Sequence, residues 1–203
     1  MKLLLATGNQ KKLAELRRII DEFGIDIQVV SKTEFGDYPD PEETGASFEE
    51  NALIKARAGA RLSGLPTVAD DSGICVAALN QMPGVRSARW AGPEHDDSEN
   101  LNLLLRQVDD VPQALRGASF VSAVALVQPD GSEMTFRGVM PGYLVTAARG
   151  ENGFGYDPIF VATEFEHGDR IRTNAELSAD EKDAISHRGK ALRQMMEYLG
   201  GVL

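Results

Sequence analysis

Cysteine is almost missing from this chain: Cys75 is the single one among 203 residues. Because an internal disulfide needs two cysteines, a disulfide framework is excluded, and a reducing compartment is favoured. Cys75 lies in an apolar run, which indicates a core position rather than a nucleophile. Long apolar stretches are also missing: none approaches the roughly 20 residues of a membrane-spanning helix, and the N-terminal run is too short for a signal-peptide core. We therefore expect a cytoplasmic protein with no membrane partner.

Positive charge is scarce relative to negative charge. The chain has 21 lysines and arginines against 31 aspartates and glutamates, which gives a net charge of −10 and a pI near 4.8. Non-specific binding to nucleic acid needs a basic surface, so the balance argues against a nucleic-acid partner. A small anionic ligand is still compatible with this net negative charge if local cations or a metal offset the repulsion between ligand and protein. Repeats and linker-like segments are missing too, so we expect one domain over residues 1–203, built from two closely packed lobes.

The N-terminal segment joins an apolar strand at residues 1–6 to a glycine-containing turn and then to a helix whose apolar residues recur between 13 and 23. Such a turn makes an anion site, because the first helical N–H groups lack intrahelical partners and Gly8 permits close backbone approach. Lys11 and Lys12 add positive charge there. A plain surface turn with solvated lysines is the alternative. The turn lacks the closing Gly-Lys-Ser/Thr of a P-loop and two of the three glycines of a dinucleotide fingerprint.

Apolar periodicity and turn residues predict the other elements. We expect strands at residues 27–30, 67–69, 74–79, 118–127, 134–139, 143–145 and 159–161, and helices at 48–62, 101–108 and 178 to about 199. Capping boxes at Ser47 and Ser178 mark two helix starts, and Gly200 and Gly201 are expected to end the last helix. Residues 129–132 have the composition of a hairpin turn. Early βαβ order followed by consecutive strands predicts an α/β fold with a mixed sheet and an active-site cleft between two lobes.

Two adjacent carboxylates, Asp70 and Asp71, directly follow a predicted buried strand. They repel each other and lose water there, which is unfavourable unless a cation or hydrogen bonds compensate. Mg²⁺ takes oxygen ligands and commonly uses only one or two carboxylates. Asp71 with Glu42 or Glu43 would therefore suffice for a metal site. An Asx-type turn, in which the aspartates cap backbone N–H groups, is the alternative.

Two later segments carry candidate ligand-binding groups. Residues 154–157, Phe-Gly-Tyr-Asp, place aromatic faces beside glycines, which suits stacking of a planar heterocycle. Asp157 would accept hydrogen bonds from its ring N–H groups; aromatic packing over a sheet edge is the alternative. Residues 186–190, Ser-His-Arg-Gly-Lys, lie inside the last predicted helix with Lys182 one turn earlier. This basic cluster suits an anion or purine contact, and a solvated basic face is the alternative.

Taken together, these segments resemble the inosine triphosphate pyrophosphatase family, whose members hydrolyse non-standard purine nucleoside triphosphates. The resemblance covers nearly the whole chain. The motifs that carry it are Thr7-Gly8-Asn9 with Lys12, Glu42-Glu43-Thr44-Gly45, Phe48-Glu49-Glu50-Asn51-Ala52, Ala69-Asp70-Asp71-Ser72-Gly73, Pro83-Gly84-Val85, Ser87-Ala88-Arg89-Trp90-Ala91-Gly92, Phe154-Gly155-Tyr156-Asp157-Pro158-Ile159-Phe160, and Glu181-Lys182 before Ile185-Ser186-His187-Arg188-Gly189-Lys190-Ala191-Leu192.

The resemblance implies a two-lobed α/β fold with an elongated mixed sheet flanked by helices, a homodimer, and Mg²⁺-dependent release of pyrophosphate from ITP, dITP or XTP. It implies that Asp71 is the proton acceptor and a metal ligand, with Glu43 as the second metal ligand. The implied substrate contacts are Thr7, Gly8, Asn9, Gln10, Lys11, Lys12, Lys55, Ser72, Arg89, Phe154, Gly155, Tyr156, Asp157, Lys182, His187 and Arg188. A donor from Arg188 or from backbone N–H groups would bind the 6-oxo group of inosine and xanthosine and disfavour the 6-amino group of adenine.

Two other functions compete with this hypothesis. A nucleotide sensor would keep the binding site without turnover, but a pure binder gains little from acidic residues facing phosphates, such as Glu43, Asp70 and Asp71. A phosphatase acting on other phosphoanhydrides would release orthophosphate or ignore the base.

Overall fold

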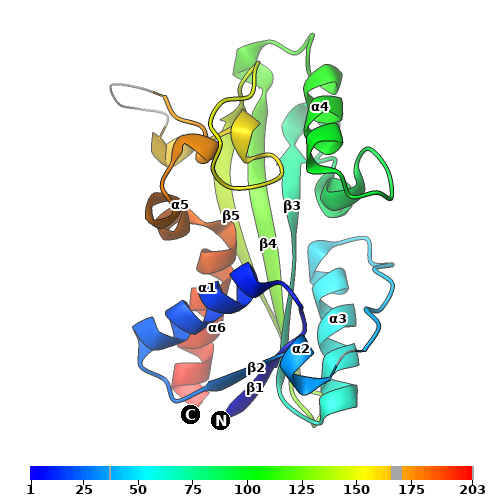
Figure 1. The fold of residues 1–203 in the computed structure, drawn as a ribbon, viewed down its shortest axis with the longest axis vertical. Coiled ribbons are helices and arrows are strands. Elements are labelled where there is room, and N and C mark those ends of the chain that lie inside the picture. The colour runs from blue at the N-terminus through cyan, green and yellow to red at the C-terminus, as the bar shows by residue number, and fades with distance from the viewer. Residues whose placement is uncertain (37, 166–170, 203) are drawn as a thin grey trace. The chain divides into compact units, whose positions relative to one another are not determined.

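The protein is described by a computed structural model that covers residues 1–36, 38–165 and 171–202. Its strands form one mixed six-stranded sheet in the order β2-β1-β3-β4-β5-β6, flanked by helices (Figure 1). Parallel pairing joins β1 to β2 and β3, while β5 and β6 pair antiparallel. The α/β fold with a mixed sheet is thereby confirmed. The strands are β1 (Lys2–Leu5), β2 (Gln28–Ser31), β3 (Thr67–Val76), β4 (Gly117–Val127), β5 (Glu133–Leu144) and β6 (Phe160–Ala162).

The helices begin mostly where capping residues predict them. The Ser47–Glu50 and Ser178–Glu181 capping boxes are both formed, each at the start of its helix. The α-helices are α1 (Gln10–Phe23), α2 (Lys32–Phe35), α3 (Phe48–Ser63), α4 (Asp97–Gln107), α5 (Ala179–Ile185) and α6 (His187–Val202). Short 3-10 turns are η1 (Ala77–Leu79), η2 (Gly84–Arg89), η3 (Gln113–Leu115), η4 (Asp157–Ile159), η5 (Thr163–Phe165) and η6 (Asn174–Glu176). None of the helices in the described part of the chain has the length and apolarity needed to cross a membrane.

The chain divides into two compact units. Unit 1 comprises Met1–Asp71, Ser122–Gly138 and Arg188–Leu203, and unit 2 comprises Ser72–Val121 and Val139–His187. Both units contain parts of β3, β4 and β5, so each unit is assembled from distant stretches of sequence. The predicted cleft between two lobes stays a prediction.

The core of unit 1 joins β1 and β2 to one face each of α1 and α6. The apolar spacing of α1 buries the residues expected from its period, and those of α6 recur in the same way. The buried members are Leu3, Leu5, Leu13, Leu16, Ile19, Ile20, Val29, Val68, Val124, Leu126, Ala191, Leu192, Met195, Met196 and Leu199.

The core of unit 2 gathers α4 and β6 with the unit 2 parts of β3, β4 and β5. Phe120 and Phe160 meet edge to face, with ring centroids 4.8 Å apart. The other buried members are Ile74, Val76, Leu101, Leu104, Val108, Met140, Leu144, Tyr156, Ile159 and Ala162.

One continuous strand replaces the predicted strand-turn-strand around Asp70 and Asp71. β3 runs unbroken through both aspartates, so the Asx-type turn is wrong. A strand can continue there because both carboxylates find partners in unit 1, as described below. Gly73 is required in this strand, since a Cβ atom would lie 2.3 Å from Ser87 Oγ and 2.5 Å from the Gly84 carbonyl oxygen.

The last predicted helix is two helices. α5 ends at Ile185, and Ser186 takes an extended backbone conformation, with φ −60° and ψ 137°, before α6 begins. The basic cluster of residues 186–190 therefore starts at a break between helices rather than inside one. α6 also continues through Gly200 and Gly201, because a glycine ends a helix by adopting a positive φ and neither of these two does.

The predicted hairpin is confirmed, but the strand after it is longer than expected. Gln128 N donates to the Ser132 carbonyl at 2.9 Å and closes the turn between β4 and β5. Residues 143–145 are mostly the end of β5 rather than a separate strand, because pairing with β6 extends it: Tyr143 lies opposite Val161.

Candidate functional site

The turn after β1 is capped by Asn9. Asn9 Oδ1 accepts hydrogen bonds from Lys11 N at 2.9 Å and Lys12 N at 3.3 Å, and Asn9 N donates to Thr7 Oγ1 at 3.2 Å. The N–H groups of Lys11 and Lys12, which lack intrahelical partners, are therefore satisfied by a side-chain cap and are not left open for an anion. The turn can therefore attract an anion chiefly through the positive charge of its lysines. Its exposed residues are Gly8, Asn9, Gln10 and Lys11.

Asp70 is the centre of an ion-pair network in unit 1. Its Oδ2 accepts from Lys12 Nζ at 2.9 Å and from Arg188 Nε at 3.0 Å, and Arg188 Nη1 lies 3.2 Å from Glu15 Oε2. The Asp70 side chain is only 5% exposed. Burial raises the pKa of Asp70, but Lys12, Arg188 and Lys55 outweigh it and hold the pKa well below its usual value. Asp70 is therefore a permanent anion that holds two cations.

Asp71 has different partners, all on or near α3. Asn51 Nδ2 donates to Asp71 Oδ2 at 3.1 Å, and Lys55 Nζ lies 3.5 Å from Asp71 Oδ1 and 2.9 Å from Glu43 Oε1. Asn51 and Lys55 are four residues apart on one helix and therefore share a face. Asn51 Oδ1 also accepts from Gly45 N at 2.8 Å, which ties the loop that carries Glu43 to the helix. Glu43 and Asp71 thus both pair with the ammonium group of Lys55.

The neighbouring aspartates differ in basicity. Burial raises the pKa of Asp71, and although Lys55 opposes this, the charges of Glu43 and Asp70 keep it above the usual value. The pKa of Lys55 is lowered by burial, but Asp71, Asp70 and Glu43 raise it above the usual value overall, so the ammonium keeps its charge. Asp71 can accept a proton more readily than Asp70, which is the separation expected where one carboxylate acts as a base.

Glu43 and Asp71 also fit a hard divalent cation. Carboxylate oxygens are the ligands that Mg²⁺ prefers. Both carboxylates already pair with one cation, the ammonium group of Lys55, so their combined negative charge favours a positive ion at this place. Within the part of the chain that the structure describes, no three carboxylate, imidazole or thiol side chains gather as a metal centre. The two carboxylates would hold an ion only with water or substrate oxygens completing its coordination.

A second cluster, in unit 2, surrounds Asp157, which is 2% exposed. Its Oδ2 accepts from Phe154 N at 2.9 Å and from Lys182 Nζ, and its Oδ1 accepts from Asn174 Nδ2 at 3.3 Å. Three donors therefore already use the carboxylate that was expected to accept from a nucleobase. Lys182 Nζ lies 4.9 Å from the centroid of the Phe154 ring, which is itself 55% exposed.

The Phe154 loop is held from two further directions. Gly155 N donates to Asp97 Oδ2 at 3.1 Å, and the hydroxyl of buried Tyr156 donates to the Ser87 carbonyl at 2.7 Å. Gly153 has φ +79°, and a Cβ atom on it would lie 2.2 Å from Asp157 Oδ2. The loop thus presents one aromatic face, that of Phe154, on a backbone fixed by hydrogen bonds.

The remaining predicted residues fall in one unit or the other. Ser72 lies half-buried in β3, Arg89 ends η2, and His187 stacks on Phe120 with ring centroids 5.2 Å apart. Unit 1 contains Thr7, Gly8, Asn9, Gln10, Lys11, Lys12, Glu43, Lys55, Asp71 and Arg188; unit 2 contains Ser72, Arg89, Phe154, Gly155, Tyr156, Asp157, Lys182 and His187.

Sequence reasoning missed several side chains that hold these clusters. The sequence does indicate a site role for Asn51, since it shares a helix face with Lys55. No sequence pattern indicates Glu15, Asp97 or Asn174, because the groups they contact lie 173, 58 and 17 residues away along the chain.

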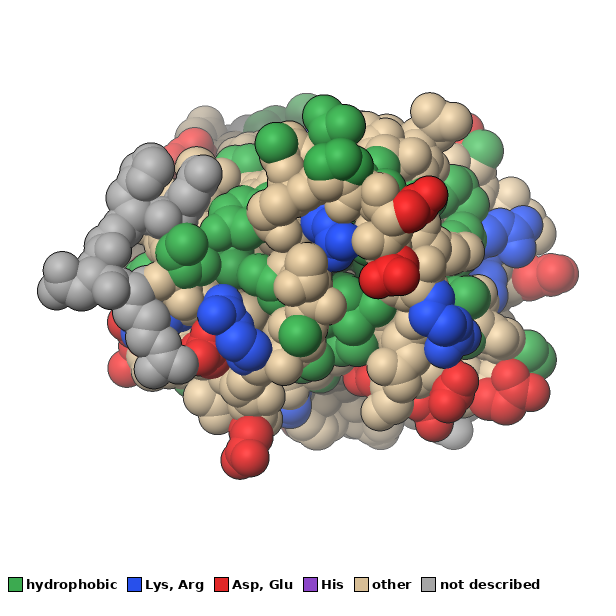
Figure 2. Space-filling model, turned by 90° about the horizontal axis from the view of Figure 1, so that it is seen from above, with side chains coloured by type: hydrophobic (Ala, Val, Ile, Leu, Met, Phe, Trp, Pro, Cys, Tyr) green, Lys and Arg blue, Asp and Glu red, His purple; other side chains and the backbone are tan. Residues whose placement is uncertain are grey.

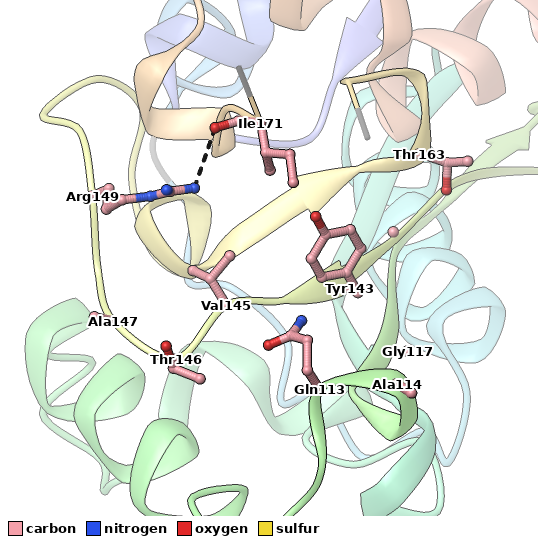
Figure 3. A pocket seen from close by; sticks show the side chains of 11 residues that line it. Gln113, Ala114, Gly117, Tyr143, Val145, Thr146, Ala147, Arg149, Thr163 and Ile171 are labelled. Atoms are coloured by element: carbon pink, nitrogen blue, oxygen red, sulfur yellow. Dashed lines mark hydrogen bonds between the residues drawn. The ribbon is translucent and has the colours of Figure 1, made fainter. Parts of the chain in front are cut away.

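A pocket of about 640 Å³ in unit 2 contains none of the predicted site residues (Figure 3). Arg149 donates to the Ile171 carbonyl at one side of it, at 3.4 Å. The pocket is lined by Gln113, Ala114, Gly117, Gly142, Tyr143, Val145, Thr146, Ala147, Arg149, Thr163 and Ile171.

Comparison with known proteins identifies the family of this chain. The model of the Ham1 family matches residues 3–198. The chain belongs to the Ham1 family. A relative from Corynebacterium efficiens named dITP/XTP pyrophosphatase is 54% identical over 198 residues, which covers 97% of this chain and 96% of the relative.

Solved structures of Ham1-family proteins agree with the fold. A crystal structure of a nucleoside-triphosphatase, dITP/XTP pyrophosphatase, from Mycobacterium abscessus is 52% identical, with a TM-score of 0.80 over 96% of this chain and 98% of that one. A HAM1 protein from Coxiella burnetii is 42% identical, with a TM-score of 0.90 over 99% of each chain.

Because Asp70 is buried and pairs with both Lys12 and Arg188, the substitution Asp70→Asn should strongly destabilise the fold. The change leaves Lys12 and Arg188 without their shared anion, so the free energy of unfolding should fall by about 3–5 kcal/mol at pH 7. Because the pKa of Asp70 is lowered in the folded state, its contribution is present above the usual value of 3.8 and is lost as pH falls further. Urea unfolding of both proteins at neutral and acidic pH measures this.

The matched control is Glu22→Gln. Glu22 pairs with Arg18 at 2.7 Å and Arg193 at 3.2 Å, but its side chain is 38% exposed, so the loss should stay below about 1 kcal/mol. Equal losses in the two variants at pH 7 would contradict the assigned role of Asp70.

Proposed function

We propose that this Ham1-family protein hydrolyses non-standard purine nucleoside triphosphates, namely ITP, dITP and XTP, to the nucleoside monophosphate and pyrophosphate. Relatives at about half identity over nearly the full length bear the name dITP/XTP pyrophosphatase. The observation that carries the proposal is the cluster in unit 1: a base of raised pKa, Asp71, beside Glu43 and the charged Lys55, with Lys12 on the neighbouring aspartate. Cleavage between the α- and β-phosphates needs that combination of proton acceptor and positive charge.

In this mechanism Asp71 takes the proton of the attacking water, since burial makes its carboxylate more basic than an exposed one. Lys55 keeps its charge and neutralises the triphosphate, and Lys11 and Lys12 stabilise the departing pyrophosphate. Glu43 and Asp71 are the proposed ligands of Mg²⁺, which when bound supplies Lewis-acid stabilisation of phosphate oxygens. Asn51 keeps the Asp71 carboxylate and the Glu43 loop in register by bonding to both.

The nucleobase is proposed to stack on Phe154. Its ring is the exposed aromatic face of the loop, and base–aromatic stacking contributes about 1–3 kcal/mol. Lys182 lies against that ring and keeps a cation beside the stacked base. Ser72, Arg89, His187 and Arg188 remain predicted substrate contacts, and so do Gly155, Tyr156 and Asp157 of the loop.

A substrate panel with separate assays for pyrophosphate and orthophosphate tests the function. With Mg²⁺ present, ITP, dITP and XTP should yield pyrophosphate and monophosphate in equal amounts, and chelation of the metal should stop turnover. ATP and GTP should react more slowly. Nucleotide binding without any pyrophosphate release would identify a sensor, and orthophosphate release would identify a phosphatase.

Removal of either proposed metal ligand should strongly reduce catalysis while sparing the fold. Asp71→Asn keeps the size of the side chain but loses the proton acceptor, so kcat for ITP should fall by about 10²- to 10⁴-fold. Glu43→Gln should give a comparable loss. The measurement is steady-state pyrophosphate release, with circular dichroism to confirm folding.

Glu42→Gln is the control for this pair. Glu42 is the exposed neighbour of Glu43, and its substitution should leave kcat within about twofold of wild type. An active Asp71→Asn protein would overturn the catalytic assignment.

We also propose that the protein is a cytoplasmic homodimer. Hydrophobic side chains lie among charged ones on the face shown in Figure 2. Within unit 2, Leu115 is 63% exposed next to the residues that line the 640 Å³ pocket, and Ile171 of that pocket is 42% exposed. Exposed apolar surface beside a hollow of this kind suits a second copy of the chain.

Light scattering after gel filtration should therefore give about twice the 22.0 kDa mass of one chain. Leu115→Arg should shift the mass toward one chain, because a charge at an apolar contact is desolvated on association. A wild-type protein with the mass of a single chain would contradict the dimer. A dimeric Leu115→Arg protein would instead place the contact elsewhere.

A further inference from the structure

Asn174 is a buried amide with an uneven set of partners. It is 1% exposed at the start of η6 in unit 2. Its Nδ2 donates to Asp157 Oδ1 at 3.3 Å and lies 3.9 Å from Met140 Sδ. Among the residues that the structure describes, Asn174 Oδ1 has no hydrogen-bond partner. The nitrogen faces the carboxylate because an oxygen there would set two acceptors against each other.

A purely structural role explains this residue poorly. A buried acceptor without a partner destabilises the fold, whereas an apolar side chain of the same size avoids that loss. The amide lies against an apolar side chain, since Asn174 Nδ2 is 3.9 Å from Sδ of fully buried Met140. Compared with a leucine, the amide provides one hydrogen-bond donor, the N–H group that donates to Asp157.

The carboxylate that Asn174 holds is the hub of the Phe154 loop. Asp157 Oδ2 accepts from Phe154 N and from Lys182 Nζ, and Lys182 lies over the Phe154 ring. A carboxylate is planar, so a hydrogen bond that fixes Oδ1 also fixes the direction of Oδ2. Rotation of Asp157 would move the backbone under the ring and the cation beside it together.

We propose that Asn174 is a positioning residue for nucleobase recognition: its amide orients the Asp157 carboxylate, which in turn sets Phe154 and Lys182. This rests on the proposed function, because it takes the Phe154 ring as the surface on which the purine stacks. Asn174 itself touches no substrate. It acts on base affinity and leaves the phosphate chemistry of unit 1 unchanged.

Two isosteric variants separate positioning from packing. Asn174→Leu removes the orphaned oxygen, which favours folding, and the donor to buried Asp157, which disfavours it, so its melting temperature should stay close to that of wild type. Its KM for ITP should nevertheless rise about tenfold, the loss of one charge-assisted hydrogen bond, with kcat within about twofold. Calorimetry should show the same tenfold weaker binding of inosine monophosphate, and unchanged binding of pyrophosphate.

Asn174→Asp supplies a pH signature that packing does not produce. Two neighbouring carboxyl groups share one proton at low pH, where the introduced group donates to Asp157, and repel each other once it is lost. The charged groups nearby are Lys182 of α5 and Glu176 of η6, and Glu176 Oε2 lies 3.6 Å from Arg149 Nε. The ratio of variant to wild-type KM should therefore be near one at about pH 5 and rise toward pH 8.

Thr173→Val is the matched control. Thr173 adjoins Asn174 and donates Oγ1 to the Arg149 carbonyl at 2.8 Å, so its loss loosens the same segment without touching Asp157. It should lower the melting temperature and leave the KM for ITP within about twofold of wild type.

The outcomes distinguish the two proposals. Wild-type affinity for inosine monophosphate in Asn174→Leu, or a KM ratio in Asn174→Asp that does not change with pH, would overturn the role of Asn174. Equal weakening by Thr173→Val would do the same. A wild-type protein that binds inosine monophosphate but releases no pyrophosphate from ITP would overturn the proposed function, and the binding comparison would still test Asn174.

Discussion

The burial of two adjacent carboxylates in one strand is the constraint on which unit 1 depends. Side chains of successive strand residues point to opposite faces, so Asp70 and Asp71 meet different surroundings. Asp70 receives Lys12 and Arg188, and Asp71 receives Asn51 and Lys55. Without these partners the strand could not continue through the pair, because an uncompensated buried charge is too unfavourable. The same partners make one aspartate a fixed anion and leave the other basic.

Unit 2 is organised around a single buried carboxylate rather than two. Asp157 gathers donors from a loop, α5 and η6, and the result is a fixed backbone beneath one exposed ring. Unit 1 therefore concentrates buried charge around its two aspartates, and unit 2 exposes an aromatic face on a fixed loop.

How far the sequence predicts this site depends on how far apart the partners are. Asn51 and Lys55 could be placed on one face because helical spacing relates residues four apart. The two capping boxes were predictable for the same local reason. Arg188 stays a predicted base contact, and the sequence did not predict that its guanidinium donates to Asp70, 118 residues away. No local pattern encodes a contact of that separation.

The sequence by itself determined the α/β class, most element positions and the family, since periodicity, capping and motif order are read from near neighbours. Tertiary structure alone decided that β3 runs unbroken, that Ser186 separates two helices, and that Asn174 bonds to Asp157. Each of these depends on how a buried polar group is satisfied. Its partners come from distant segments, so only the folded chain specifies them.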